Sequence, residues 1–371
     1  MKIIITYASA GAGHFKAAQA VYNYFKEADQ SLDLKFVDIL DHCSGMFKLI
    51  YIKGYSLLIN HFPWMWACLF GCTSSRFLWP LTNKLHLMIN RLSIRSYARL
   101  ICKENADLVI STHFLSSQMV SYLKQKGKIK SKLVTVITDF GVHPLWISAG
   151  TDSYVVASDI TLKLLNGYGI ASDKILPIGI PIDAKFNVEL SRQALASKFL
   201  ISADKFTVLI LTGSFGLGPI EQIVSKLCSD IQLLVVCANN KRLFNNLVAA
   251  NYPNTKIYGF VDNVEELMAV SDLIVTKPGG LSISELLAKE LVPVFICPIP
   301  GQEEANASVM KDYGIGVSVS NAASLKEVLS IYRNDLSAMA QIKNKIRIIK
   351  RPFAAKELYS ALRQSSYWVT S

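Results

Sequence analysis

Residues suited to binding an anion follow the apolar run Leu273–Thr276, which predicts a short buried strand. A Lys-Pro-Gly-Gly turn comes next. Ser282 and Glu285 then have the spacing of a capping box, so we expect a helix to begin at Ser282. Gly279 and Gly280 would let a ligand approach the backbone just before the free N–H groups of that helix, where negative charge is favoured.

More polar groups are expected beside this helix start. The carboxylate of Glu285 would lie one turn into the helix, and Gln302, Glu303 and Asn306 follow the next predicted strand, Val292–Cys297. A phosphorylated sugar or a nucleotide combines the anionic and hydroxyl groups that such a set would bind. An ordinary strand–helix–strand crossover with a glycine turn is the alternative that these residues leave open.

The first strand and turn of the chain place a histidine in a comparable position. Lys2–Tyr7 is predicted to be a strand, and a small-residue turn leads from it to His14 and a helix over Phe15–Ala28. Open α/β sheets bind ligands at the carboxyl ends of their strands, and a histidine there can act as a general base. A capping or packing role is the alternative. Lys16 replaces the third glycine of the dinucleotide fingerprint, so that motif is not met.

A second polar motif, Thr-Asp-Phe-Gly-Val-His-Pro-Leu-Trp, follows the predicted strand Lys132–Thr138. It contains Asp139, His143 and Trp146. Because the carboxyl ends of parallel strands meet at one edge of a sheet, we expect these three residues to lie at the same edge as His14.

The elements that must position these residues form two α/β halves. Further apolar runs predict strands at Leu34–Leu40, Asp107–Ser111, Asp152–Ala157, Thr207–Leu211, Leu233–Cys237 and Lys256–Phe260. Amphipathic patterns predict helices at Leu325–Arg333, Leu336–Lys350 and Ala354–Gln364. Proline and glycine mark a linker at Leu176–Phe186, and the second half has its own glycine turn, Thr212–Pro219. The pattern indicates two doubly wound sheets.

Composition is consistent with this plan. With 371 residues, 51% of them hydrophobic, the chain is long enough for two domains with cores of their own. The seven cysteines are scattered, with no C-x-x-C pair and no Cys/His cluster, which favours reduced thiols over a disulfide framework or a zinc site. Reduced thiols fit a protein exposed to the cytosol, and the apolar run at the start is too short for a signal peptide.

The positive charge is concentrated in one segment. Between Cys43 and Lys132 there are thirteen Lys and Arg residues and two acids, which accounts for the whole net charge of +11. Such a block favours an anionic partner, either nucleic acid or an anionic membrane surface.

The apolar part of this block suits a membrane interface. Lys48 and Lys53 interrupt it, so it is not a credible spanning helix. Trp64, Trp66 and Trp79 interleave with basic residues, as in segments that lie in the plane of a membrane surface. A buried helical pair with a solvated basic face is the alternative.

Five motifs in a fixed order carry a specific resemblance: S-A-G-A-G-H, T-D-F-x-x-H-P-x-W, T-G-S-F-G-x-G-P, K-P-G-G-x-S-x-S-E and G-Q-E-x-x-N. Together they resemble the monogalactosyldiacylglycerol synthase and processive diacylglycerol glucosyltransferase group of glycosyltransferase family 28. There are two departures. The first turn reads G-A-G-H where the group usually has G-G-G-H, and Ser214 and Phe215 stand where small glycines are common. Both leave the preferred donor open.

The resemblance implies a GT-B fold, in which two doubly wound Rossmann-like domains face a cleft. Residues 1–180 would form the acceptor and membrane-binding domain, with 353–371 packing back on it, and residues 187–350 would bind a UDP-sugar. It further implies an inverting transfer that needs no metal and no cofactor. The sequence has no D-x-D run placed to hold a metal–diphosphate.

The resemblance also implies individual roles. Donor-binding positions are Gly13, Ser214, Phe215, Gly216, Gly279, Gly280, Ser282, Glu285, Gln302 and Glu303. Among them Glu285 would hold the ribose hydroxyls, and Gln302 and Glu303 the sugar. His14 and Asp139 are the catalytic candidates, and His143 and Trp146 would bind the acceptor.

The expected activity is hexose transfer from UDP-glucose or UDP-galactose to diacylglycerol, or a similar lipid, by a peripheral enzyme at the cytoplasmic face of a membrane. The alternative is transfer of N-acetylglucosamine to an undecaprenyl-linked peptidoglycan precursor, although the T-D-F-x-x-H-P-x-W motif favours the glycolipid branch. A nucleotide-sugar epimerase would need no membrane surface. Nucleic-acid binding would leave the five motifs unexplained, so no nucleic-acid partner is expected.

Overall fold

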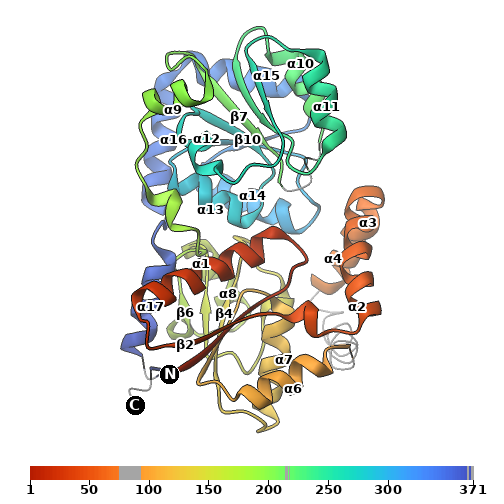
Figure 1. The fold of residues 1–371 in the computed structure, drawn as a ribbon, viewed down its shortest axis with the longest axis vertical. Coiled ribbons are helices and arrows are strands. Elements are labelled where there is room, and N and C mark those ends of the chain that lie inside the picture. Colours follow the sequence, from red (N-terminus) through yellow and green to blue (C-terminus); the bar gives the residue numbers. More distant parts are fainter. Residues whose placement is uncertain (75–92, 214–215, 217, 366, 369–371) are drawn as a thin grey trace. The chain divides into compact units, whose positions relative to one another are not determined.

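The computed structural model describes residues 1–74, 93–213, 216, 218–365 and 367–368 and divides the chain into two compact units (Figure 1). Unit 1 comprises Met1–Asp183, Ile299–Ala305 and Phe353–Ser371. Unit 2 comprises Ala184–Pro298 and Asn306–Pro352.

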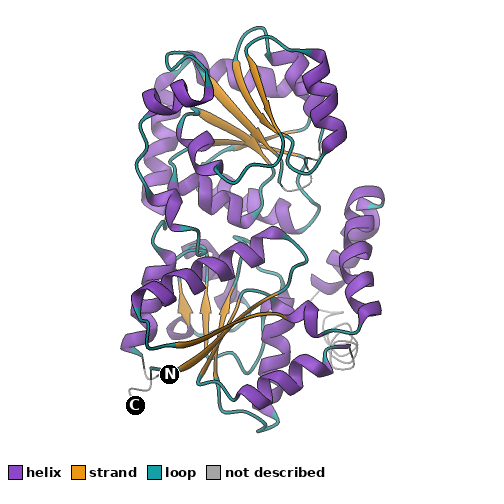
Figure 2. Ribbon diagram, viewed as in Figure 1, coloured by secondary structure: helices purple, strands orange, loops and turns teal. Residues whose placement is uncertain are grey.

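Unit 1 contains a layer of strands flanked by helices (Figure 2). This sheet has six strands in the order β2-β1-β3-β4-β5-β6, with every neighbouring pair parallel. Its strands are β1 (Lys2–Tyr7), β2 (Asp33–Asp38), β3 (Leu108–Ser111), β4 (Lys132–Val136), β5 (Ser153–Val155) and β6 (Ile175–Leu176). Its α-helices are α1 (Ala12–Ala28), α2 (Gly45–Leu49), α3 (Tyr55–His61), α4 (Pro63–Ser74), α6 (Arg95–Glu104), α7 (Phe114–Gln125), α8 (Asp159–Gly167) and α17 (Ala354–Gln364). Shorter helical turns are η1 (Ile39–His42), the π-helix η2 (Ile50–Gly54), η3 (Pro144–Trp146) and η4 (Ser172–Lys174).

Helices cover both faces of this sheet. Successive side chains of a strand point to opposite faces, so the consecutive apolar residues of β1 must be buried on both. Ile3 and Ile5 of β1 are buried in one cluster with residues of α1 and α17. Ile4, between them, is buried in a second cluster with residues of α6 and α7. The C-terminal helix α17 therefore completes the core of unit 1, where the ring of Tyr359 lies 5.1 Å from that of Phe25.

Unit 2 also contains a parallel sheet flanked by helices (Figure 2). Its strand order is β12-β11-β10-β7-β8-β9, again with all neighbours parallel. Its strands are β7 (Thr207–Leu211), β8 (Gln232–Val236), β9 (Thr255–Tyr258), β10 (Leu273–Thr276), β11 (Val292–Ile296) and β12 (Val317–Val319). Its helices are η5 (Ala184–Asn187), α9 (Arg192–Phe199), α10 (Ile220–Leu227), α11 (Lys241–Ala250), α12 (Val264–Ala269), α13 (Gly280–Ala288), α15 (Ala322–Asn334) and α16 (Leu336–Ile349). Helix α14 (Gln302–Asp312) has its first turn in unit 1 and the rest in unit 2.

Several predicted boundaries are wrong by a few residues. Helix α13 begins at Gly280 rather than at Ser282, and its N-cap, Gly279, has no side-chain cap. The capping-box prediction therefore fails, because Ser282 already lies inside the helix. Helix α1 likewise begins at Ala12, which puts His14 in its first turn. The strands β6 and β12, of two and three residues, were missed because they are too short to show a periodic pattern.

The segment 45–74, part of the basic and apolar block, is helical and largely exposed. Neither α2 nor α4 contains a buried residue, which argues against a buried helical pair in this segment, whereas residues 75–92 of the block lie outside the described residues. We define the apolar surface as the exposed side chains of Met46, Leu49, Ile50, Leu57, Phe62, Trp64 and Leu69. Among the described residues, no helix has the length and apolarity needed to cross a bilayer.

Candidate functional site

The edge of the unit 1 sheet where β1, β3 and β4 end holds His14. Its Nδ1 lies 2.9 Å from the backbone oxygen of Thr112 and 2.8 Å from Oγ1 of Thr138. Thr112 follows β3 and Thr138 follows β4, so residues at the ends of two neighbouring strands contact the same nitrogen of the ring. Oγ1 of Thr112 also donates a hydrogen bond of 2.9 Å to the backbone oxygen of His14.

These contacts determine which nitrogen of His14 can accept a proton. A carbonyl oxygen only accepts hydrogen bonds, so the contact with Thr112 favours the tautomer in which Nδ1 carries the hydrogen. Nε2 of the neutral ring then holds the lone pair. Burial lowers the pKa of His14 below its usual value, against the opposing effects of the Asp139 charge and the Thr112 hydrogen bond. The ring is therefore neutral near pH 7, as a general base must be.

Asp139 lies close enough to His14 for its charge to act on the imidazole. Its side chain is buried, and both of its carboxylate oxygens accept from Nε2 of Gln302, at 3.1 and 3.0 Å. Gln302 belongs to the Ile299–Ala305 stretch of unit 1. The structure thus brings together two residues that are 163 positions apart in the chain.

His143 and Trp146 lie in the same part of unit 1. Nδ1 of His143 accepts from the backbone N–H of Leu145 and caps η3, while Nε2 lies 3.2 Å from Oγ1 of Thr73. Trp146 is buried, with its ring 6.0 Å from that of His14. Asp139 and Trp146 therefore lie near His14, as predicted from the strand ends, and His143 begins the short helical turn that contains Trp146.

A further histidine in this region was missed. His113 caps α7 through Nδ1, is 2% exposed, and has its ring 4.6 Å from that of His14 in an edge-to-face arrangement. Its Nε2 lies 3.4 Å from the hydroxyl of Tyr51, in η2. The strand-end rule that selected Asp139 would also have selected Thr112 and His113, since both directly follow a buried strand.

In unit 2 the predicted donor residues gather around two turns. Gly216 has a φ of +55° and packs against the backbone oxygen of Cys237, at the end of β8. Asn240 donates 3.1 Å to the oxygen of Gly216 and so fixes this turn. A side chain at 216 would clash with the backbone, so the turn needs glycine here.

The second turn precedes α13. Gly279 and Gly280 form the start of this helix, and Glu285 lies in its second turn with 6% of its surface exposed. The amide of Asn306 donates 3.1 Å to the backbone oxygen of Pro278, which fixes the turn to α14. A helix start and a carboxylate thus follow β10, as the sequence predicted.

The remaining predicted donor positions are spread over different parts of the chain. Gly13 lies in the first turn of α1, in unit 1, and Ser282 is half-buried within α13. The carboxylate of Glu303 accepts from the backbone N–H of Ile299 at 2.7 Å, which is a helix-capping contact. Ser214, Phe215 and Trp79 lie outside the described residues.

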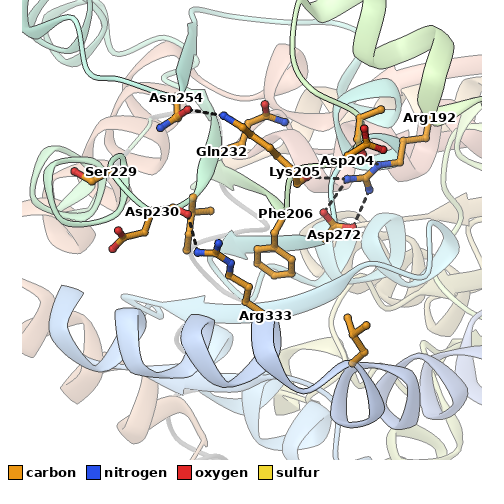
Figure 3. Close-up of a pocket in the computed structure, with 13 residues that line it drawn as sticks. Arg192, Asp204, Lys205, Phe206, Ser229, Asp230, Gln232, Asn254, Asp272 and Arg333 are labelled. Atoms are coloured by element: carbon orange, nitrogen blue, oxygen red, sulfur yellow. Dashed lines mark hydrogen bonds and ion pairs between the residues drawn. The ribbon is translucent and has the colours of Figure 1, made fainter.

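A separate pocket of about 720 Å³ opens at the opposite edge of the unit 2 sheet, where β7, β8, β9 and β10 begin (Figure 3). Several polar groups of this pocket bind one another. Arg192 contacts both oxygens of Asp272 at 2.8 and 2.9 Å, and Asp272 also accepts from the N–H of Thr207. Arg333 donates to the backbone oxygen of Asp230. These contacts close the amino edge of the sheet, away from the strand ends where α/β sheets bind substrates.

The residues that the structure describes contain no group of three or more His, Cys, Asp and Glu side chains that could hold a metal ion. Transfer without a metal stays a prediction.

Comparison with known proteins agrees with the geometry. Residues 14–182 match the family model for monogalactosyldiacylglycerol (MGDG) synthase, and residues 207–355 match the glycosyltransferase family 28 C-terminal domain. The chain is 26% identical over 381 residues to a processive diacylglycerol beta-glucosyltransferase of Bacillus thuringiensis (strain Al Hakam), covering 99% of this chain and 94% of that relative.

Two solved structures share the fold. MurG of Acinetobacter baumannii has a TM-score of 0.64 at 14% identity, covering 98% of this chain and 99% of its own. The UDP-GlcNAc 2-epimerase of Neisseria meningitidis bound to UDP-GlcNAc has a TM-score of 0.62 at 13% identity. The match covers 98% of this chain and 100% of the epimerase. At such identities these likenesses concern the fold alone.

The two units, each with a parallel six-stranded sheet, have the GT-B fold, which MurG shares. The N-terminal part of the chain belongs to the MGDG synthase family, and its C-terminal part is a glycosyltransferase family 28 C-terminal domain. The predicted family, fold class and enzyme class are confirmed.

Proposed function

We propose that this enzyme transfers a hexose from UDP-glucose or UDP-galactose to diacylglycerol, or a similar membrane lipid, at the cytoplasmic surface of a membrane. The relative from Bacillus thuringiensis is named for transfer of glucose to diacylglycerol, and the similarity spans 99% of the chain. No cofactor is required in this proposal.

The chemistry is an inverting displacement. The acceptor hydroxyl oxygen attacks the anomeric carbon, the bond from that carbon to the UDP oxygen breaks, and the hydroxyl proton passes to a base. Nε2 of His14 is the proposed base, since Thr112 holds the hydrogen on Nδ1 and burial keeps the ring neutral. The Asp139 charge would stabilise the imidazolium that forms. The departing diphosphate would meet the N–H groups at the start of α13.

One observation supports a membrane lipid as the acceptor. The helical segment that bears the apolar surface also supplies Tyr51 and Thr73 to two histidines of the site, His113 and His143. A lipid hydroxyl that stays in the bilayer could therefore reach the base without the lipid leaving the membrane. An acceptor dissolved in water would give no reason for such exposed apolar side chains beside the site.

Purified protein, liposomes containing dioleoylglycerol and each radiolabelled UDP-sugar in turn would test this proposal. We expect a labelled hexosyl-diacylglycerol from UDP-glucose or UDP-galactose. Labelling of an undecaprenyl-linked peptidoglycan precursor by UDP-N-acetylglucosamine, with no labelled diacylglycerol, would favour the other branch of the family.

Membrane binding should depend on the apolar surface. Met46 is 74% exposed and Trp64 66%, and each buried apolar side chain contributes about 1.5–3 kcal/mol. We expect Met46→Ser combined with Trp64→Ser to weaken co-sedimentation with anionic vesicles at least tenfold. Lys53→Gln should reduce the salt sensitivity of binding, since a basic residue near an anionic surface contributes about 1 kcal/mol.

Ile348 in unit 2 is a matched control, because it is 75% exposed but lies on α16. Ile348→Ser should bind vesicles like the unchanged protein. Equal loss of binding in the control and the test variant would remove the apolar surface from the proposal.

A further inference from the structure

We propose that helix α4 positions the carboxylate of Asp139, acting through the stretch Ile299–Ala305. This inference rests on the proposed function, in which Asp139 lies beside the base. It assigns to Trp66 and Phe70 a role distinct from membrane contact, namely that of positioning residues.

The side chains of α4 divide between two surfaces. Trp64 and Leu69 belong to the exposed apolar surface. Trp66 and Phe70, one turn apart, are half-buried. The indole Nε1–H of Trp66 donates 3.2 Å to the backbone oxygen of Pro300. A single helix thus carries both the proposed membrane contacts and contacts to the Ile299–Ala305 stretch.

Phe70 makes the second contact. Its ring fills the space that a side chain at position 301 would take, and Gly301 has a φ of +81°, which glycine adopts without strain. The same ring lies 4.5 Å from the ring of His143. Phe70 therefore packs between Gly301 and His143.

The stretch held in this way carries Gln302. Its amide donates to both oxygens of Asp139, and Ala305 packs against Gly141, two residues beyond Asp139. A buried carboxylate with a fixed donor has a fixed orientation, and here that orientation sets the distance between its charge and His14. Trp66 would therefore influence the base through Pro300, Gln302 and Asp139 in turn.

Trp66→Phe removes the indole N–H and keeps an aromatic ring. We expect kcat on a short-chain, water-soluble diacylglycerol to fall about threefold to tenfold, the effect of one neutral hydrogen bond, with UDP affinity unchanged. Trp368→Phe removes an indole N–H elsewhere in unit 1, and Cys68→Ser changes an exposed side chain of α4 itself. Both controls should keep the kcat of the unchanged protein.

A double-mutant cycle tests whether Trp66 acts through Gln302. If it does, Trp66→Phe should lower kcat less than twofold in a Gln302→Ala background. The contact between Gln302 and Asp139, through which Trp66 would act, is already absent there. A full threefold to tenfold loss in that background would mean that Trp66 acts by another route and would overturn the proposal. An unchanged kcat in the Trp66→Phe variant would also overturn the proposal.

A measurement that needs no transfer separates this inference from the proposed function. The charge of Asp139 raises the pKa of His14, so loosening Asp139 should lower it. NMR titration of the His14 ring should show similar decreases in Trp66→Phe and Gln302→Ala. An unchanged His14 pKa in Trp66→Phe would overturn the inference, whereas absence of transfer by the unchanged protein would count against the proposed function alone.

Discussion

Replacing His14 by alanine is expected to lower turnover about 10²–10⁴-fold, the usual contribution of a positioned general base. UDP affinity should change little, because the ring is held by Thr112 and Thr138 of unit 1, whereas the proposed UDP-binding turns lie in unit 2. Turnover, acceptor KM and UDP affinity, measured on the same preparation, would check this. His61→Ala, at an exposed histidine of α3, is the matched control and should leave turnover unchanged.

Asp139→Asn distinguishes the two candidates for the base. If His14 is the base, the acidic limb of the kcat/KM profile reports its pKa, so activity falls as the pH drops through a value below the usual 6.5. Removing the Asp139 charge should move that limb to still lower pH, because this charge raises the pKa. Near-normal turnover in His14→Ala, together with abolished turnover in Asp139→Asn, would identify Asp139 as the base.

Much of the site could be predicted from the sequence because one topological rule governs it. Parallel strands bring their carboxyl ends to one edge, so polar residues directly after apolar runs converge. His14 and Asp139 follow β1 and β4 in this way, and Gly280 follows β10. The same rule applies to His113, after β3, which was missed because its motif was not recognised.

The rest depended on contacts that no local pattern encodes. The pairing of Gln302 with Asp139 and of Trp66 with Pro300 joins residues 163 and 234 positions apart. Their formation depends on tertiary packing rather than on periodicity or turn chemistry. The tryptophans of segment 45–74 were likewise treated as one group, whereas Trp64 is exposed and Trp66 contacts the backbone of another segment. Lys48 also forms an ion pair with Asp41 at 2.7 Å, so its charge is partly compensated within the protein.

Helix α13 shows how a wrong local prediction can leave a functional one intact. Its start is two residues earlier than the capping-box pattern indicated, because glycine rather than serine occupies the N-cap. Without a side-chain cap, the first N–H groups of the helix have no serine hydroxyl to bind. A helix start without such a cap suits the proposed diphosphate contact at least as well as the predicted start would have.

The second large effect is expected for Glu285→Ala, which should weaken UDP binding about tenfold to over a hundredfold. In the role that the family resemblance implies, this carboxylate accepts hydrogen bonds from the ribose hydroxyls, and a hydrogen bond to a charged group contributes about 1.5–3 kcal/mol. Glu285 lies in the second turn of α13, about 7 Å along the helix from its first residue, so it could contact the ribose while the helix start binds the diphosphate. Calorimetry with UDP would measure the change.

Because Glu285 is only 6% exposed, its replacement could also act through stability, and a second carboxylate separates the two effects. Glu290, shortly after the same helix, forms ion pairs with Arg347 at 2.7 Å and Lys350 at 2.8 Å. Glu290→Ala should therefore lower the Tm and leave UDP affinity near its original value. Glu285→Gln, which keeps the shape but loses the charge, should lose UDP affinity with little change in Tm. If the calorimetric UDP affinity of Glu285→Gln equals that of the unchanged protein, the ribose assignment is wrong, and the buried carboxylate serves only the fold of unit 2.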